Sequence, residues 1–185
     1  MKTTYTISVF TEDKIGLLNR ISIIFTRRHI NVESITASEI EVKGIYRYTI
    51  TVTTTKEQVE KLVKQIEKQV EVFKAFYHLN SQVISREIAL YKISTEALKE
   101  NELFTRVVRE NHANILSVSP EFIVLEKAGE EREIQNLFSE LERFGVLEYV
   151  RSGKVAITKP MKTLTTYLKE IENNNKITVK HFNNN

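Results

Sequence analysis

Residues 4–25 read TYTISVFTEDKIGLLNRISIIF, and this stretch decides the fold. From Tyr5 to Val9 polar and apolar residues alternate, which predicts a half-buried β-strand. From Leu17 to Phe25 apolar residues recur every three or four positions, the spacing of an amphipathic helix. A polar loop separates the two patterns, so we expect a strand, a loop and a helix.

The chain after this helix adds two strands, a second helix and a closing strand. These elements are predicted over residues 31–42, 45–54, 59–70 and 70–77. Lys43 and Gly44 form the expected turn between the two strands, and Thr55 is the expected N-cap of the helix. The resulting order, βαββαβ, is the split βαβ arrangement of a ferredoxin-like module.

The same order repeats at an offset of 83 residues. HINVES at 29–34 corresponds to HANILS at 112–117, and both sequences stand at the entry to the second strand of a module. The repeated strands and helices are predicted over residues 87–94, 103–108, 115–119, 122–126, 134–141 and 146–151, with a turn at 119–121 and Gly145 as a helix C-cap.

The predicted fold class is therefore α+β, with two ferredoxin-like βαββαβ modules. Each module is expected to place two helices on one face of a four-stranded antiparallel sheet. We expect a first domain over 1–79, a linker near 79–85 and a second domain over 86–159. Residues 160–185 are expected to be a tail, with one short helix followed by a disordered end.

Composition argues against several functional classes. The chain has no cysteine, only five glycines and four scattered histidines, and it contains none of the motifs GxxxxGK[ST], GxGxxG, GxSxG or HExxH. We therefore expect no catalytic residues, no metal site and no cofactor in this chain. His29 and His112 follow helices at equivalent positions, where a capping or packing role is the preferred interpretation over metal binding.

Nucleic acid and membranes are also not expected as partners. The net charge is +3, and basic and acidic residues are interspersed. An RNA-binding module is a third, disfavoured hypothesis, because only Lys43 and Gly44 of the third strand match the RNP1 pattern. No apolar run reaches the length of a membrane span, and the absence of cysteine fits a cytoplasmic protein.

The loop from Asp13 to Leu18 is the candidate ligand site. Free N–H groups at a helix N-terminus attract an anion such as a carboxylate, and Gly16 permits close approach of the backbone. Asp13 could receive an ammonium group, so the loop suits an amino-acid zwitterion. The alternative, favoured by spacing alone, is that Gly16 only permits a turn and Asp13 only caps the helix. The offset of 83 replaces Gly16 by Lys99, so the second module lacks this glycine.

Residues 13–35, DKIGLLNRISIIFTRRHINVESI, carry a family resemblance. They resemble the N-terminal ACT domain of the small, regulatory subunit of acetolactate synthase (acetohydroxyacid synthase), which typically reads N-x-x-G-x-L-x-R-V-x-x-L-F-x-R-R-G-[FY]-N-I-[ED]-S-L. REIALYKI at 86–93 and RSGKVA at 151–156 resemble the opening and the close of that family's second domain. The resemblance covers about residues 4–160.

The resemblance implies a regulatory protein of branched-chain amino acid biosynthesis. Such a subunit has no catalysis of its own and binds and activates a large catalytic subunit, a transferase that uses thiamine diphosphate, Mg and FAD. It usually confers feedback inhibition by valine or a similar amino acid. ACT domains pair into homodimers with the effector between protomers. The alternative hypothesis is a free-standing ACT-type amino-acid sensor that controls another enzyme or a transcription factor.

The resemblance also assigns effector-binding residues. One protomer would supply the loop before the first helix, and the other would supply the start of its second strand. These residues are Asp13, Ile15, Gly16, Leu17, Leu18, Asn31 and Val32. Asp13 replaces the family's asparagine, and an ionised aspartate cannot donate a hydrogen bond to a carboxylate. His29 replaces the family's glycine, which is tolerable if the backbone there is not left-handed.

Overall fold

The chain folds into two units in the computed structural model, which describes residues 1–159, apart from the side chains of 99–101. The first unit comprises Met1–Ile84 together with residues 156–159, and the second comprises Ser85–Val155. The short helix and disordered end predicted within 160–185 lie outside the described residues.

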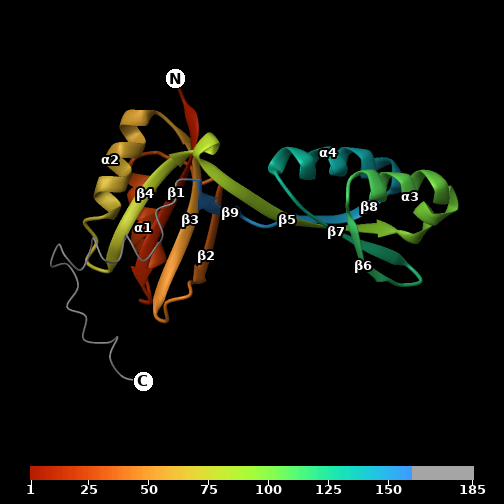
Figure 1. Cartoon of the computed structure of the whole chain (residues 1–185), viewed down its shortest axis with the longest axis horizontal. Helices are drawn as coiled ribbons and strands as arrows, with labels where there is room; N and C mark the ends of the chain where they lie inside the picture. Colours follow the sequence, from red (N-terminus) through yellow and green to blue (C-terminus); the bar gives the residue numbers. More distant parts are fainter. Residues whose placement is uncertain (160–185) are drawn as a thin grey trace. The chain divides into compact units, whose positions relative to one another are not determined.

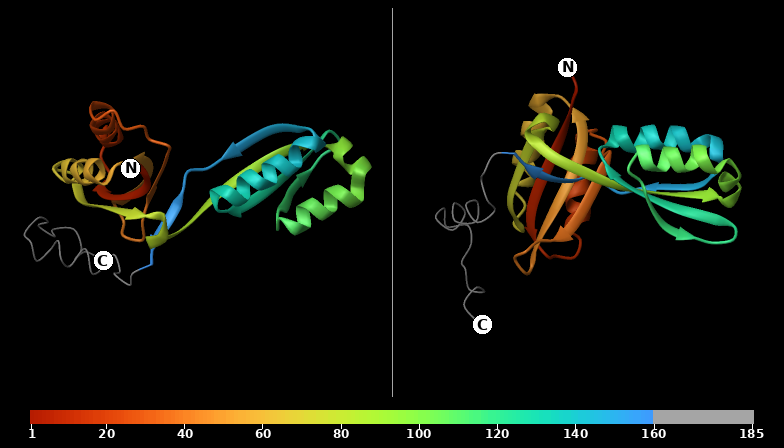
Figure 2. Two further views of the ribbon diagram at one scale, coloured as in Figure 1. Left: turned by 90° about the horizontal axis from the view of Figure 1, so that it is seen from above. Right: turned by 45° about the vertical axis from the view of Figure 1, so that its right-hand side comes forward.

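The first unit has the predicted βαββαβ order (Figure 1). Its elements are β1 (Thr3–Glu12), α1 (Leu17–Arg27), β2 (Ser34–Glu39), β3 (Ile45–Thr54), α2 (Lys56–Ile66) and β4 (Val72–Leu79). The four strands form an antiparallel sheet in the order β2-β3-β1-β4. Both helices cover one face of this sheet (Figure 2).

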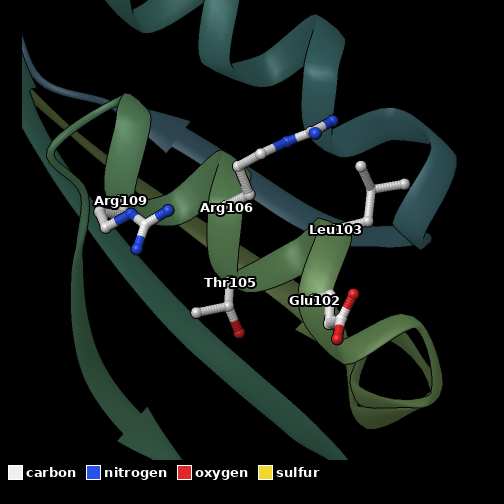
Figure 3. A pocket seen from close by; sticks show the side chains of 5 residues that line it. All are labelled: Glu102, Leu103, Thr105, Arg106 and Arg109. Atoms are coloured by element: carbon white, nitrogen blue, oxygen red, sulfur yellow. The ribbon is translucent and has the colours of Figure 1, made fainter.

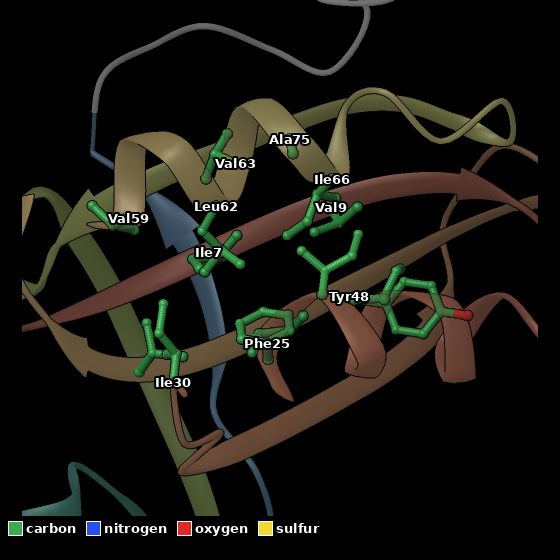
Figure 4. Close-up of a cluster of buried hydrophobic side chains, with 14 of the residues drawn as sticks. Ile7, Val9, Phe25, Ile30, Tyr48, Val59, Leu62, Val63, Ile66 and Ala75 are labelled. Carbon is green, nitrogen blue, oxygen red and sulfur yellow. The ribbon is translucent and has the colours of Figure 1, made fainter. Parts of the chain in front are cut away.

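The core of the first unit lies between that face and the helices (Figure 4). Ile7 and Val9 of β1 are fully buried, and so are Leu62 and Ile66 of α2. The predicted half-buried strand is wrong, however, because Thr6 and Ser8 on the opposite face of β1 are also buried. The N-terminus of α2 is capped as predicted. Thr55 Oγ1 accepts a hydrogen bond from the Gln58 amide, and the Gln58 side chain accepts one from the Thr55 amide, which forms a capping box.

Some predicted boundaries differ in the first unit. β2 ends at Glu39, so the hairpin to β3 is a longer loop than the predicted turn at Lys43 and Gly44. Two hydrogen bonds close this loop. The Ile40 amide donates to the Ile45 carbonyl, and the Ile45 amide donates to the Val42 carbonyl. Val70 was predicted to lie on the second helix, but it follows the end of α2 and is 93% exposed.

The second unit repeats the arrangement. Its elements are β5 (Val83–Ser94), α3 (Asn101–Glu110), β6 (Asn114–Val118), β7 (Phe122–Gly129), α4 (Glu131–Leu141) and β8 (Val146–Arg151). The strand order β6-β7-β5-β8 matches that of the first unit under the offset of 83 residues. The predicted C-cap is confirmed, because Gly145 adopts a left-handed backbone (φ 79°) after a short 3-10 turn.

His29 and His112 occupy the same backbone position in the two units. Both are left-handed, with φ values of 52° and 51°. After α1 the Ile30 amide bonds to the carbonyl of Phe25 and the His29 amide to that of Thr26, the paired bonds of a Schellman motif. Histidine in place of the family's glycine would be tolerable if the backbone at residue 29 were not left-handed. The backbone is left-handed there, so His29 holds a conformation that favours glycine.

One strand of the structure has no counterpart in the sequence prediction. β9 (Val155–Thr158) pairs with β5. The amide of Lys159 also bonds to the carbonyl of Gln82, with an N–O distance of 3.0 Å. The Lys159 bond joins the end of β9 to Gln82 of the first unit, and the pairing with β5 adds a fifth strand to a sheet for which four strands were predicted.

Candidate functional site

The loop between β1 and α1 forms a tight turn that ends at Gly16. The Leu17 amide bonds to the Lys14 carbonyl at 3.2 Å, and Gly16 is the N-cap of α1 with φ 82° and ψ −3°. A side chain at this position would meet open space but would hold a strained backbone. The turn therefore requires glycine for its conformation.

The N-terminus of α1 presents free backbone donors. No side chain caps the helix, so the alternative that Asp13 serves as its cap is wrong. The Arg20 amide makes the first helical bond, to the Gly16 carbonyl at 3.1 Å. The amides of Leu18 and Asn19 have no acceptor within residues 1–159. Together with the helix dipole, these donors suit a carboxylate or another small anion.

Asp13 is held by its backbone, and its carboxylate is exposed. Its amide bonds to the carbonyl of Gly44, at the start of β3, with an N–O distance of 3.3 Å. The Tyr48 side chain is 8% exposed, and its pKa is raised by burial and then by the negative charge of Asp13. Tyr48 thus borders the candidate site, although the sequence analysis missed it. The alternation in β3 predicts that Tyr48 faces the core, but its closeness to Asp13 depends on the pairing of β1 with β3.

The apolar candidate residues of the loop differ in accessibility. The side chain of Ile15 is fully exposed and that of Leu18 is 47% exposed, whereas Leu17 is completely buried in the core. Ile15 and Leu18 can therefore contact a ligand or a second protein with their side chains. Leu17 can do so only with its backbone.

Asn31 and Val32 lie at the far end of α1. They follow the Schellman motif and lead into β2, where the amide of Glu33 bonds to the carbonyl of Thr51 at 2.9 Å. Asn31 is exposed, and Val32 packs partly against the core. The 11 residues of α1 separate this segment from the 13–18 loop by about 16 Å. A single chain therefore does not bring the two halves of the predicted site together.

The edge of the sheet beside this segment is open. β2 pairs with β3 in a regular register from Ser34 to Glu39, and no other described strand pairs with it. Ile35 on β2 and Ile23 on α1 are each 39% exposed. An unpaired, unbulged edge strand with exposed apolar neighbours is a template for pairing with another chain.

The second unit carries a hollow on the outer face of α3 (Figure 3). It is lined by Glu102, Leu103, Thr105, Arg106 and Arg109. Arg106 Nε lies 3.9 Å from Glu110 Oε1 in an exposed ion pair, and such pairs contribute little to the free energy of unfolding. The hollow is open to solvent and does not include any predicted site residue.

The described residues show no constellation of a metal centre. Within 1–159 no three side chains of the types His, Cys, Asp or Glu come together as possible ligands. Among the same residues, no helix has the length and apolar character that a membrane span requires.

Comparison with known proteins covers both units. The family model described as the small subunit of acetolactate synthase matches residues 86–160, and the AHAS small subunit-like ACT domain matches residues 7–74. The acetolactate synthase small subunit of Mycobacterium bovis is 33% identical over 163 residues, which are 88% of this chain and 96% of that protein. The Bacillus subtilis small subunit is 34% identical over 160 residues, with 86% and 91% covered.

A solved structure agrees with these matches. The acetolactate synthase small subunit of Thermotoga maritima superposes with a TM-score of 0.78 at 27% identity, and the match covers 86% of this chain and 99% of that one. The likeness thus extends through both βαββαβ units in the same order. The chain belongs to the family of small, regulatory subunits of acetolactate synthase.

Proposed function

We propose that this chain binds and activates the thiamine-diphosphate-dependent catalytic subunit of acetolactate synthase and confers feedback inhibition by valine or a similar amino acid. The observation that carries the proposal is the family match over both units. Thiamine diphosphate, Mg and FAD belong in this proposal to the catalytic subunit. This chain contributes regulation and no catalytic residue, and we expect the complex in the cytoplasm.

The effector site is proposed to form between two copies of the first unit. A two-fold axis beside β2 makes the α1 helices of the two copies antiparallel, so opposite ends of the helices become neighbours. The 13–18 loop of one copy then approaches Asn31 and Val32 of the other. The open edge of β2 and the separation of about 16 Å within one chain support this arrangement.

In this site the roles follow from the geometry of the loop. The free amides of Leu18 and Asn19 receive the effector carboxylate, and Gly16 leaves room for it. Ile15 and Leu18 offer apolar contact to an aliphatic side chain. Asp13 lies at the same loop and adds a negative charge, which favours the ammonium group and repels a carboxylate that comes too near.

The decisive experiment is reconstitution with the catalytic subunit from the same source. Acetolactate formation from pyruvate is assayed with and without this chain, and co-elution is followed by gel filtration. We expect a higher rate and a stable complex. An unchanged rate without co-elution would refute the proposal, and recovery of a different enzyme or a transcription factor as partner would favour a free-standing sensor.

The proposed inhibition by valine is tested with single substitutions. Gly16→Asp is expected to abolish inhibition by valine, because it places an anion where the carboxylate docks. Gly145→Asp is the matched control, since it introduces the same residue at a left-handed glycine of the other unit (φ 79°). Intact inhibition in Gly16→Asp would move the site elsewhere.

Asp13→Asn tests the departure from the family pattern. Removing an exposed negative charge near a bound carboxylate is expected to tighten valine binding roughly fivefold, which corresponds to about 1 kcal/mol. Isothermal titration calorimetry on the full chain measures this change. Weaker binding in the variant would show that Asp13 instead holds the ammonium group.

A further inference from the structure

Arg47 on β3 points to the face of the first sheet that lies opposite the helices. In the sheet it stands between Phe10 on β1 and Ser38 on β2. Its Nη2 atom donates hydrogen bonds to Ser8 Oγ, at 3.1 Å, and to the carbonyl of Ala156. Its guanidinium also lies 5.5 Å from the ring centre of Phe10. Arg47 therefore connects the sheet to β9.

The guanidinium is only partly satisfied at this place. Its Nε atom is buried without a hydrogen-bond partner, and it forms no ion pair within the described part of the chain. Burial lowers the pKa of Arg47, and Glu41 opposes this effect. A desolvated guanidinium depends strongly on the few acceptors it has. The Ala156 carbonyl is one of them, so the bond to β9 matters to both groups.

The sheet face near Arg47 is lined with hydroxyl groups that are also unsatisfied. Thr51 stands opposite Thr6 on one side and Ser34 on the other, and the three hydroxyl oxygens are buried without a hydrogen-bond partner. Buried hydroxyls without partners favour states in which water reaches them. These three hydroxyls lie on the same face of the sheet as Arg47.

The strands around Arg47 also lead to the candidate effector loop. The Asp13 amide bonds to the carbonyl of Gly44, which lies just before β3 and three residues, or about 10 Å, before Arg47. Phe10, the partner of Arg47 on β1, stands three residues before Asp13. The loop is therefore linked through the backbone to both strands that hold Arg47 in place.

We propose that Arg47 is a positioning residue that fastens β9 to the sheet of the first unit and relays the state of the 13–18 loop to this strand. β9 begins at Val155, where the chain returns from the second unit. The fastening stands on the contacts of Arg47 alone. The relay of an effector signal rests on the proposed function.

Hydrogen exchange of residues 155–159 in the full chain tests the fastening. Arg47→Met keeps the apolar stem but removes the donors, and exchange at this segment is expected to rise at least about tenfold. Ser8→Ala removes the other acceptor of Nη2 and is a control that leaves the bond to Ala156 intact. Lys74→Met, on the same row of the same face, removes a cation that pairs with Glu67 at 2.7 Å. Neither control should change the exchange of 155–159.

Two results would overturn the fastening. One is unchanged exchange in Arg47→Met, and the other is an equal rise in Ser8→Ala, which would indicate a general loosening of the sheet. If Arg47→Met does not fold, Arg47→Lys replaces it, because lysine keeps the charge and loses the fixed guanidinium donors. An intermediate rise in exchange is expected from Arg47→Lys, and no rise would count against the proposal.

A double-mutant cycle tests the relay without any ligand. Gly16→Ala strains the loop, since φ is 82° there, and meets no neighbouring atom. We expect it to change the exchange of 155–159 in the wild-type background by several-fold, and to have no effect in the Arg47→Met background. Equal effects in both backgrounds would overturn the relay.

Valine as a probe separates this inference from the proposed function. In the wild type, saturating valine is expected to protect the 13–18 loop and to change the exchange of 155–159; in Arg47→Met only the loop should respond. Protection of the loop without any response at 155–159 in the wild type would refute the relay. If valine protects neither segment, the effector part of the proposed function fails, while the exchange data without ligand still decide the role of Arg47.

Discussion

His29 at the C-terminal end of α1 offers a direct test of the backbone argument. Its φ of 52° places an L-residue in the left-handed region, which costs about 1–2 kcal/mol relative to a right-handed conformation. The side chain is exposed, so His29→Gly loses little contact. Glycine also lowers the free energy of unfolding by about 0.5–1 kcal/mol, because it increases the entropy of the unfolded chain. The net expectation is a gain of about 0.5–1 kcal/mol in the free energy of unfolding.

The assay is urea unfolding of the full chain followed by far-UV circular dichroism, with hydrogen exchange at α1 to localise the effect to the first unit. Arg27→Gly is the matched control, because it introduces glycine two residues earlier, at the last residue of α1, where the backbone is right-handed and about 1 kcal/mol should be lost. His112→Gly should give a similar gain in the second unit, where φ is 51°. If His29→Gly is no more stable than the wild type while Arg27→Gly loses stability, the strain assigned to His29 does not exist.

Three further outcomes are expected from single substitutions. Thr55→Ala should lower the free energy of unfolding by about 1 kcal/mol, measured by urea unfolding, because it removes the N-cap of α2. Tyr91→Phe should cost about 1 kcal/mol in thermal unfolding, since the Tyr91 hydroxyl donates to the buried carbonyl of Ile134 at 2.9 Å. Glu87 is 4% exposed, and burial raises its pKa above the ordinary 4.5 more than Arg151 lowers it. A raised folded-state pKa gives stability that is present at low pH and lost as the pH rises through it, so Glu87→Gln should be more stable than the wild type at pH 7 and should lose this advantage near pH 4 in urea titrations; an equal difference at both values would contradict the assignment.

Local patterns in the sequence were sufficient to predict most of the elements. The alternation from Tyr5 to Val9 and the apolar spacing from Leu17 to Phe25 are properties of neighbouring residues, and a strand or a helix places the apolar members on one face. Thr55 and Gly145 act at helix ends through bonds and dihedral angles a few residues away. Such features can be predicted because their physics is short-range.

The candidate site could be predicted only in part. The glycine turn before α1 follows from residue types and their spacing, and the structure shows Gly16 in the left-handed conformation with free amides after it. Tyr48 enters the site through the pairing of β1 with β3, and its closeness to Asp13 cannot be deduced from a separation of 35 positions in the chain. The assignment of the seven effector residues remains a prediction.

By itself, then, the sequence determined two βαββαβ modules, their helix caps and the position of the loop that suits an anion, because periodicity, capping and turn chemistry act between near neighbours. Only the tertiary structure decided that β9 pairs with β5 and that Arg47 reaches the carbonyl of Ala156, 109 residues away. These features depend on which distant segments the folded sheet brings into contact. A local sequence pattern does not predict these contacts, because they depend on the packing of the whole unit.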